Sequence, residues 1–290
     1  MFLDLLISGL TLGGLYALVA MGLTLQYGVA RIMNLAYGEF LIAASFLAWL
    51  FTAKFGINPI TSLIVIIPLS FTFSWLVYRV LMVPLVRRSK AGAALEKDSI
   101  LATFGLMFIL QGILLVTFGG NYTSYSFLSV PVQILGTHVA ANRLLVFISA
   151  LLIGGSAYLL MKKTRFGVAV QAIASEPASA VLVGINVALV SALAFSTGGA
   201  LVSASGVLIS MFLPFSATMG VLFTMKALVV VIMGGVGNMK GCLVAGMLLG
   251  FVEAIVARLV DPGLTIVSNY ALFLLVLIFL PKGLYGRASQ

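Results

Sequence analysis

The sequence contains few charged residues, and this scarcity sets the class of protein. Only 8% of its 290 residues are charged, 62% are hydrophobic, and the mean hydropathy is +1.23. A water-soluble domain could not sustain such a surface, so lipid is the expected solvent. Charge is absent altogether from 5–30, 55–78, 99–142, 177–225 and 262–281. Each run is long enough to cross a bilayer, which takes about 20 helical residues.

Cysteine and histidine each occur once. Cys242 cannot form an internal disulfide, and its apolar neighbours favour a small core residue. His138 falls in the expected external loop 119–142, where it would be solvated. With so few such groups and few carboxylates, neither a metal cluster nor a Ser/His/Asp set can be assembled. The sequence therefore argues against a metal site and against an integral-membrane enzyme.

Two targeting or binding signals are also missing. The start, Met1-Phe2-Leu3-Asp4, lacks the basic region of a signal peptide, so the first apolar run is expected to be a retained span. No G-x-x-x-x-G-K-[ST] pattern occurs, because Lys240 precedes a glycine in the glycine-rich stretch 234–241 instead of following one. Any ATP that drives this protein must bind to another chain.

The apolar runs are continuous, whereas a β-barrel would show short alternating segments, so helices are the expected spanning element. We expect an all-α, polytopic bundle of about eight or nine spans, with re-entrant or broken helices, forming one transmembrane domain over 1–290. The expected spans are 5–29, 38–53, 58–82, 99–118, 143–161, 186–210, 222–236, 241–259 and 264–281. The segment 222–236 could be a half-crossing.

Basic residues are concentrated at alternate ends of these spans. Clusters such as Arg87-Arg88 and Lys162-Lys163 are taken as cytoplasmic, which leaves Lys54, Arg143, Lys226 and Arg258 at outer ends. The bias places the N-terminus outside and the C-terminus inside, and it explains the net charge of +9 without nucleic acid.

Two membrane segments are unusually short and begin beside Asn and Gly. Such segments point to the solute path of a transporter, because broken helices expose backbone dipoles there. The candidate path residues are Asn34, Tyr37, Gly38, Glu39, Gly234, Gly235, Gly237 and Asn238. The alternative is a pair of interfacial turns in which Asn34 and Asn238 cap helices.

Two carboxylates lie near membrane depth. A functional role is the default hypothesis for Glu39, although it could instead pair with Arg31 at the interface. Glu253 is interpreted as a helix-face charge near the outer surface, close to Arg258. Small residues at Gly9-x-x-x-Gly13, Gly198-Gly199 and Gly246-x-x-x-Gly250 predict closely packed helices.

The polar stretch 162–186 is too punctuated to span a membrane. It predicts one short helix over about 167–174 and a second that starts near Ser175 or Glu176, with Pro177 in its first turn and Gly184 as its stop. Short cytoplasmic helices with small side chains suit docking into a groove on a soluble partner.

Here the sequence resembles a known family. The pattern Arg165-Phe-Gly167, Glu176-x-x-x-Ala180-x-x-x-Gly184 is similar to the coupling loop of permeases in branched-chain amino-acid ABC importers, the LivH type. Two further stretches are similar, from Gly14 to Glu39 and from Lys226 to Gly241, so the resemblance covers nearly the whole chain. The sequence departs from many relatives after the loop glycine, where Val168, Val170 and Gln171 replace arginines, which puts partner specificity in doubt.

The resemblance implies a non-catalytic permease subunit in the bacterial inner membrane that moves branched-chain or other small neutral amino acids by alternating access. Its implied partners are a second permease subunit of the LivM type, two cytoplasmic ATP-binding subunits that use ATP and Mg, and a periplasmic binding protein; no cofactor is expected on this chain. The expected coupling residues are Arg165, Gly167, Gln171, Ala172, Glu176, Ala180 and Gly184. Urea or short amides are alternative solutes, and a stand-alone secondary transporter is the alternative class.

Overall fold

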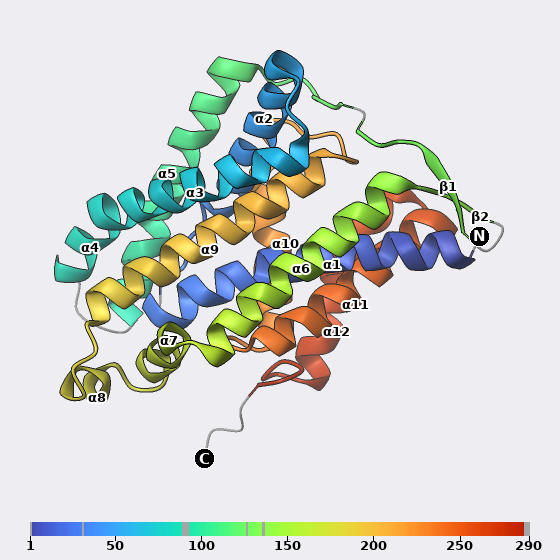
Figure 1. The fold of residues 1–290 in the computed structure, drawn as a ribbon. Coiled ribbons are helices and arrows are strands. Elements are labelled where there is room, and N and C mark those ends of the chain that lie inside the picture. The colour runs from blue at the N-terminus through green and yellow to red at the C-terminus, as the bar shows by residue number, and fades with distance from the viewer. Residues whose placement is uncertain (1, 31, 89–92, 126, 135–136, 287–290) are drawn as a thin grey trace.

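The computed structural model describes residues 2–30, 32–88, 93–125, 127–134 and 137–286, and it is almost entirely helical (Figure 1). The elements are α1 (Phe2–Ala30), α2 (Tyr37–Phe55), α3 (Pro59–Val77), a π-helical turn η1 (Tyr78–Met82), α4 (Val83–Arg88), α5 (Ala93–Phe118), β1 (Pro131–Ile134), β2 (Thr137–Ala140), α6 (Ala141–Lys163), α7 (Arg165–Ser175), α8 (Pro177–Leu182), α9 (Val187–Ser210), α10 (Gly220–Gly234), α11 (Met239–Leu259), a 3-10 turn η2 (Pro262–Leu264) and α12 (Thr265–Phe279).

Within these ranges, eight helical segments are long and apolar enough to cross a membrane, and α3, η1 and α4 form one of them. Helix α10 is apolar but shorter, with 15 residues. The expected polytopic helical bundle is therefore confirmed. The boundaries differ from the expected spans by a few residues, which is usual at helix ends.

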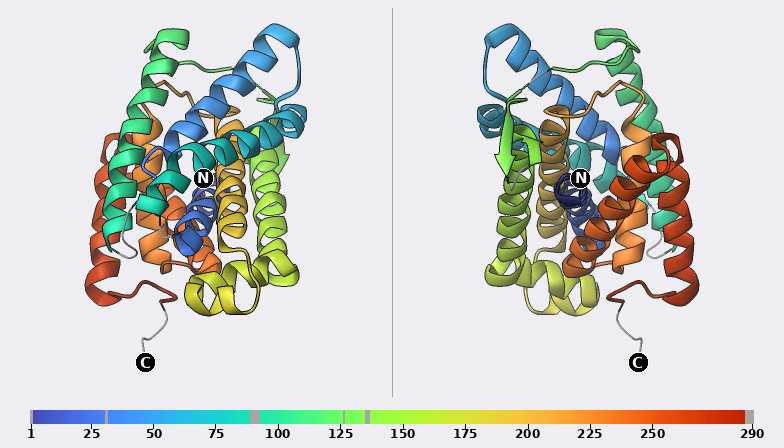
Figure 2. Two further views of the ribbon diagram at one scale, coloured as in Figure 1. Left: turned by 90° about the vertical axis from the view of Figure 1, so that its left-hand side faces the viewer. Right: turned by 90° about the vertical axis from the view of Figure 1, so that its right-hand side faces the viewer.

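Helix α1 runs through the centre of the bundle, with α6 and α12 on opposite sides of it (Figure 2). It packs against α11, α9, α6 and α10, and most of its side chains from Leu15 to Leu25 are buried. Helices α3, α5, α6 and α12 instead expose large apolar side chains such as Ile64, Leu101, Leu152 and Ile278. In water this surface would be unfavourable, whereas in a bilayer it is covered by lipid or by a partner helix.

The glycine pairs meet at the interface between α1 and α11. A Cβ added at Gly250 would meet the backbone of Gly13, and one added at Gly246 would lie 2.7 Å from the Cα of Ala17. These helices therefore approach at backbone distance, as the small-residue spacing predicts. Lipid provides no hydrophobic driving force for the association of helices, so van der Waals attraction at this close contact contributes instead.

The two ends of the bundle differ. The N-terminus and the antiparallel hairpin of β1 and β2 lie at one end of the bundle, and α7 and α8 lie at the other (Figure 1). Thr123, in the loop after α5, forms an isolated antiparallel bridge with Phe215, in the segment between α9 and α10. The C-terminal segment returns to α10, where the amide of Leu284 donates to the carbonyl of Met233 at 2.7 Å.

Candidate functional site

Helix α2 begins inside the bundle. The hydroxyl of Tyr37, the first residue of α2, donates to the carbonyl of Val19 at 2.9 Å and lies 3.2 Å from that of Gly198. Val19 and Gly198 are near the middles of α1 and α9, and Tyr37 itself is fully buried. The segment before α2 thus turns back at depth and does not end at the interface.

The buried turn before α2 is held by side-chain amides. Asn34 donates through Nδ2 to the Oε1 atom of Gln26 at 3.2 Å, and its Oδ1 atom accepts from the amide of Ala36 at 3.1 Å. Gln26 in turn donates to the carbonyl of Phe195 on α9 at 3.0 Å. Irregular backbone inside the bundle therefore finds its partners within the protein. Asn34 does not cap α2: the N-cap is Ala36, and the amide that Asn34 binds belongs to that residue and not to the helix.

Glu39 lies in the first turn of α2 and is fully buried. Neither of its carboxyl oxygens has a hydrogen-bond partner in the part of the chain that the structure describes. Its carboxyl group packs against Gly220, where an added Cβ would collide with it. The alternative pairing with Arg31 falls outside the described residues. Burial of a carboxyl group without a hydrogen-bond partner costs free energy. Packing alone therefore does not explain why a glutamate stands at this position.

The first turn of α10 is joined to the first turn of α2. The Oγ1 atom of Thr224 accepts from the amide of Gly38 at 2.8 Å and lies 3.2 Å from the carbonyl of Leu35. A Cβ at Gly38 would collide with the carbonyl of Gly220. Two helix N-termini, each the positive end of a helix dipole, therefore converge beside Glu39. We call this junction of Leu35–Glu39 with Gly220–Thr224 the α2–α10 seam.

The second candidate segment lies elsewhere. Residues 234–238 follow the C-terminal end of α10, roughly 20 Å from Gly220 at the usual helical rise. Gly235 and Gly237 have φ angles of 97° and 82°, which favour glycine. Asn238 caps α11 by accepting from the amides of Lys240 and Gly241. The two candidate segments are therefore not brought together, and the capping alternative holds for Asn238.

The partner of the 34–39 segment is instead Gly220–Thr224, which sequence reasoning missed. A signal was present, because small polar residues cluster in Ser216-Ala217-Thr218-Met219-Gly220 just before an apolar run. The sequence predicts a span that begins at residue 222, two residues after the observed start of α10 at Gly220.

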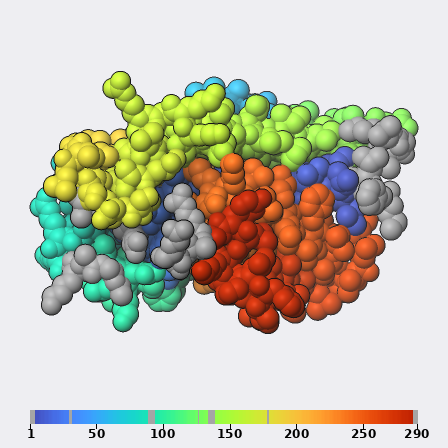
Figure 3. Space-filling view, turned by 90° about the horizontal axis from the view of Figure 1, so that it is seen from below, coloured from blue at the N-terminus to red at the C-terminus, as the bar shows by residue number. Residues whose placement is uncertain are grey.

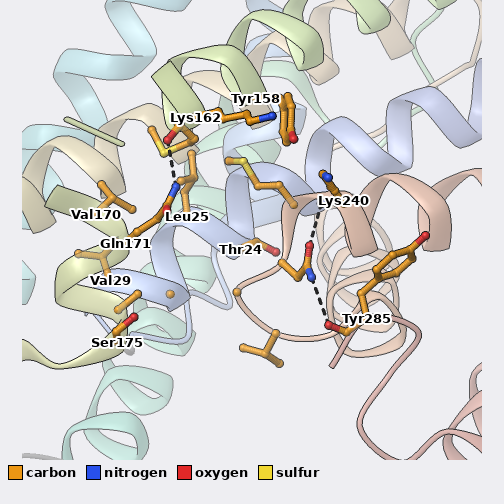
Figure 4. A pocket seen from close by; sticks show the side chains of 17 residues that line it. Thr24, Leu25, Val29, Tyr158, Lys162, Val170, Gln171, Ser175, Lys240 and Tyr285 are labelled. Atoms are coloured by element: carbon orange, nitrogen blue, oxygen red, sulfur yellow. Dashed lines mark hydrogen bonds between the residues drawn. The ribbon is translucent and has the colours of Figure 1, made fainter. Parts of the chain in front are cut away.

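A cavity of about 540 Å³ opens beside residues 236–240 (Figure 4). From below, the blue of α1 is visible in a hollow between the yellow-green α7–α8 region and the red C-terminal segment (Figure 3). The walls of the cavity come from α1, α6, α7, the α10–α11 turn and the C-terminal segment. They comprise Thr24, Leu25, Gly28, Val29, Tyr158, Met161, Lys162, Val170, Gln171, Ala174, Ser175, Val236, Gly237, Asn238, Met239, Lys240 and Tyr285. We call it the α7 pocket.

The predicted helix–turn–helix in 162–186 is present as α7 and α8. Thr164 caps α7 by accepting from the amide of Gly167, and Pro177 stands in the first turn of α8. Gly184 ends α8 with a φ of 80°. Helices of this kind need such caps because their terminal amides and carbonyls lack partners.

The expected coupling residues divide by exposure. Arg165, Gln171, Glu176 and Gly184 are exposed, Ala172 is half-buried, and Gly167 and Ala180 are buried. Gly167 packs directly on the carbonyl of Met161, and Gln171 donates to the same carbonyl at 3.1 Å. Both contacts attach α7 to the end of α6.

Lys226 and Glu253 correct the sequence interpretation. They were placed at outer ends, but Lys226 Nζ donates to both carboxyl oxygens of Glu253, at 2.8 and 2.9 Å, and to the Tyr16 hydroxyl at 2.7 Å. Among the salt bridges of the described residues, Arg258 pairs with Asp4 and not with Glu253, with 3.7 Å between Nη2 and Oδ2. Helix α10 begins inside the bundle and therefore carries Lys226 into a partly buried position. A charge at such a position requires a partner.

A multi-pass apolar bundle with a polar seam at its centre, a short helix beginning at depth and a pair of helices at one end defines a membrane transport protein. The chain belongs to the family of permease components of branched-chain amino acid transport systems, whose model matches residues 5–281.

Similar proteins span nearly its whole length. They include the high-affinity branched-chain amino acid transport system permease protein LivH of Salmonella typhimurium, 28% identical over 99% of this chain and 96% of the relative. The corresponding permease protein BraD of Pseudomonas aeruginosa is 27% identical with the same coverage. A probable LivH of Methanocaldococcus jannaschii is 28% identical over 83% of this chain and 77% of the relative. No solved structure matches.

Proposed function

We propose that the chain is the permease subunit of an ABC importer in the bacterial inner membrane, and that it translocates branched-chain or other small neutral amino acids. The single observation that carries this proposal is the family match over residues 5–281. The α7–α8 pair supports it, because it presents exposed side chains at one end of the bundle and is attached to α6.

The proposed partners are a second permease subunit of the LivM type, two ATP-binding subunits and a periplasmic binding protein. ATP and Mg are used by the partners, and this chain is non-catalytic. Closure of the ATP-binding subunits pushes on α7 and α8 through Arg165, Glu176 and Gly184. The push reaches α6 through Met161 and reaches α1 and α9, against which α7 also packs. Rocking of these helices alternates access to the path.

In this mechanism the α2–α10 seam lines the path at the centre of the membrane through Tyr37, Gly38 and Glu39, and Asn34 lines the path beside the seam. Gly234, Gly235, Gly237 and Asn238 belong to its cytoplasmic end. The class of stand-alone secondary transporters is less well supported, because Glu253 is occupied by Lys226 and only Glu39 is left as an ion-coupling carboxylate of the two considered.

The test is uptake by the importer reconstituted in proteoliposomes with its partners. Glu176→Lys together with Gly184→Trp is expected to abolish ATP-dependent leucine uptake while the permease stays folded and inserted. Lys54→Gln, at the opposite end of the bundle, is the control and should transport normally. Normal uptake by the double variant, or leucine uptake by the permease without partners, would contradict the proposal.

A further inference from the structure

Within the described residues, the α7 pocket carries a positive charge that no acidic side chain balances. Lys162 and Lys240 both line it, and neither takes part in a salt bridge within the described ranges. No Asp or Glu is among the residues that line it. In Figure 4 the Lys162 side chain points toward Tyr158, and Lys240 lies on the α11 side of the pocket; both lysines are exposed. An anionic group would therefore be favoured beside these lysines.

Apolar side chains form part of the pocket wall, beside the polar side chains of Thr24, Tyr158, Gln171, Ser175, Asn238 and Tyr285. Leu25 and Val29 come from α1, Met161 from α6, Val170 from α7 and Met239 from α11. Leu25, Val29, Met161 and Val170 are buried, so these side chains are held by packing. Apolar walls combined with a limited number of polar groups are the usual form of a small-molecule site. The occupant that fits is a small aliphatic molecule with a carboxylate.

We propose that the α7 pocket is the cytoplasmic release site for the transported amino acid. Lys162 and Lys240 attract its carboxylate, and the apolar wall receives its aliphatic side chain. With no acidic side chain on the pocket wall, the ammonium group stays in water, which favours weak binding and release. This inference rests on the proposed function and adds to it the place and the charge partners of the leaving solute.

The walls of the α7 pocket also connect the proposed release site to α7, the helix on which the ATP-binding subunits are proposed to push. In Figure 4, Val170, Gln171 and Ser175 of α7 lie on one side of the pocket, and Lys240 of α11 and Tyr285 lie on the other. Any movement of α7 relative to α11 therefore changes the width of the pocket. Release from this site is thus controlled by the same helix that receives the push from the ATP-binding subunits.

The test uses the complete importer in inside-out membrane vesicles and a leucine-sized amino acid with a photoreactive diazirine on its side chain. After illumination, mass spectrometry should locate cross-links on Val29, Met161, Val170 or Met239. Unlabelled leucine and isovalerate, which has the carboxylate alone, should compete. Isoamylamine, which has the amine alone, should not.

Lys162→Gln with Lys240→Gln is expected to lower the cross-linking roughly fivefold to tenfold, as expected for loss of two partly exposed charge partners. Lys163→Gln removes the same charge from the neighbouring residue, which is outside the pocket, and should leave cross-linking unchanged. Equal competition by isoamylamine, equal loss in Lys163→Gln, or cross-links confined to other residues would overturn the inference. Leucine uptake measured in parallel distinguishes the two failures: uptake without pocket cross-links refutes only the release site, and absent uptake refutes the proposed function.

Discussion

Lys226 on α10 and Glu253 on α11 form an ion pair inside the bundle, with the ammonium group 2.8 Å from Oε1 and 2.9 Å from Oε2. Only 21% of the Lys226 side chain and 13% of the Glu253 side chain are exposed. Asn269 on α12 donates to the same carboxylate at 2.9 Å. The pair thereby joins three helices and Tyr16 on α1.

Removing one member of this pair should destabilise the protein. Glu253→Gln leaves the Lys226 charge buried without a counterion, and the expected loss is about 3 kcal/mol, the lower end for buried pairs because both side chains keep some exposure. Unfolding of the purified permease in detergent checks this. Adding Lys226→Met to Glu253→Gln should recover more than half of the loss, and a double variant that is worse than Glu253→Gln would contradict this account.

The contact between α1 and α11 should not tolerate a methyl group. In Gly250→Ala the new Cβ would meet the backbone of Gly13 and would lie 2.8 Å from the carbonyl of Gly9. Overpacking of this kind costs about 1–3 kcal/mol. The matched control is Gly112→Ala on α5, where no atom lies within 4 Å of the new Cβ. It should be neutral or stabilising by up to about 1 kcal/mol. Equal unfolding temperatures for both variants would show that the interface is looser than described.

Glu39→Gln separates folding from transport. The glutamine is similar in size, and no hydrogen bond of the carboxyl group within the described chain is lost, so the unfolding temperature should change little. Leucine uptake by the complete importer should fall about tenfold or more, because a carboxyl group at membrane depth is retained for function. Uptake at the wild-type rate with unchanged stability would remove Glu39 from the path.

The amides before α2 should act as a unit. Asn34→Ala removes the acceptor for the Ala36 amide and the donor to Gln26, and a buried unpaired donor costs about 1–3 kcal/mol. In a double-mutant cycle with Gln26→Met, the two losses should be non-additive by about 0.5 kcal/mol or more, since the residues share a hydrogen bond. Unfolding in detergent measures all three variants. Strict additivity would mean that the Asn34–Gln26 contact contributes nothing.

Much of the fold could be predicted because lipid restricts the choices. Charge-free runs must be helices in a membrane, and Pro177 and Gly184 carry the local signals of the start and the end of a helix. The small residues of α1 and α11 indicated close packing, and the structure shows that they meet each other. These features depend on residues near one another in sequence or on a property of the whole run.

The pairings across the bundle could not be predicted in the same way. Glu39 meets Gly220, and Glu253 meets Lys226, although nothing in the sequence relates their positions. The depth at which α10 begins is set by tertiary packing of Thr224 on Gly38, so a charge count along the chain placed Lys226 too far out. The roles of the path and coupling residues stay predictions for the experiments above.

Helix α10 has only 15 residues, yet it is fastened near both ends to segments outside the bundle core. Phe215, five residues before it, exchanges two backbone hydrogen bonds with Thr123 in the loop after α5, and its last turn accepts from Leu284 and Tyr285 of the C-terminal segment. The two ends of this short helix are therefore linked, through backbone hydrogen bonds, to the loop after α5 and to Tyr285 beside the α7 pocket, with none of the long helices between them.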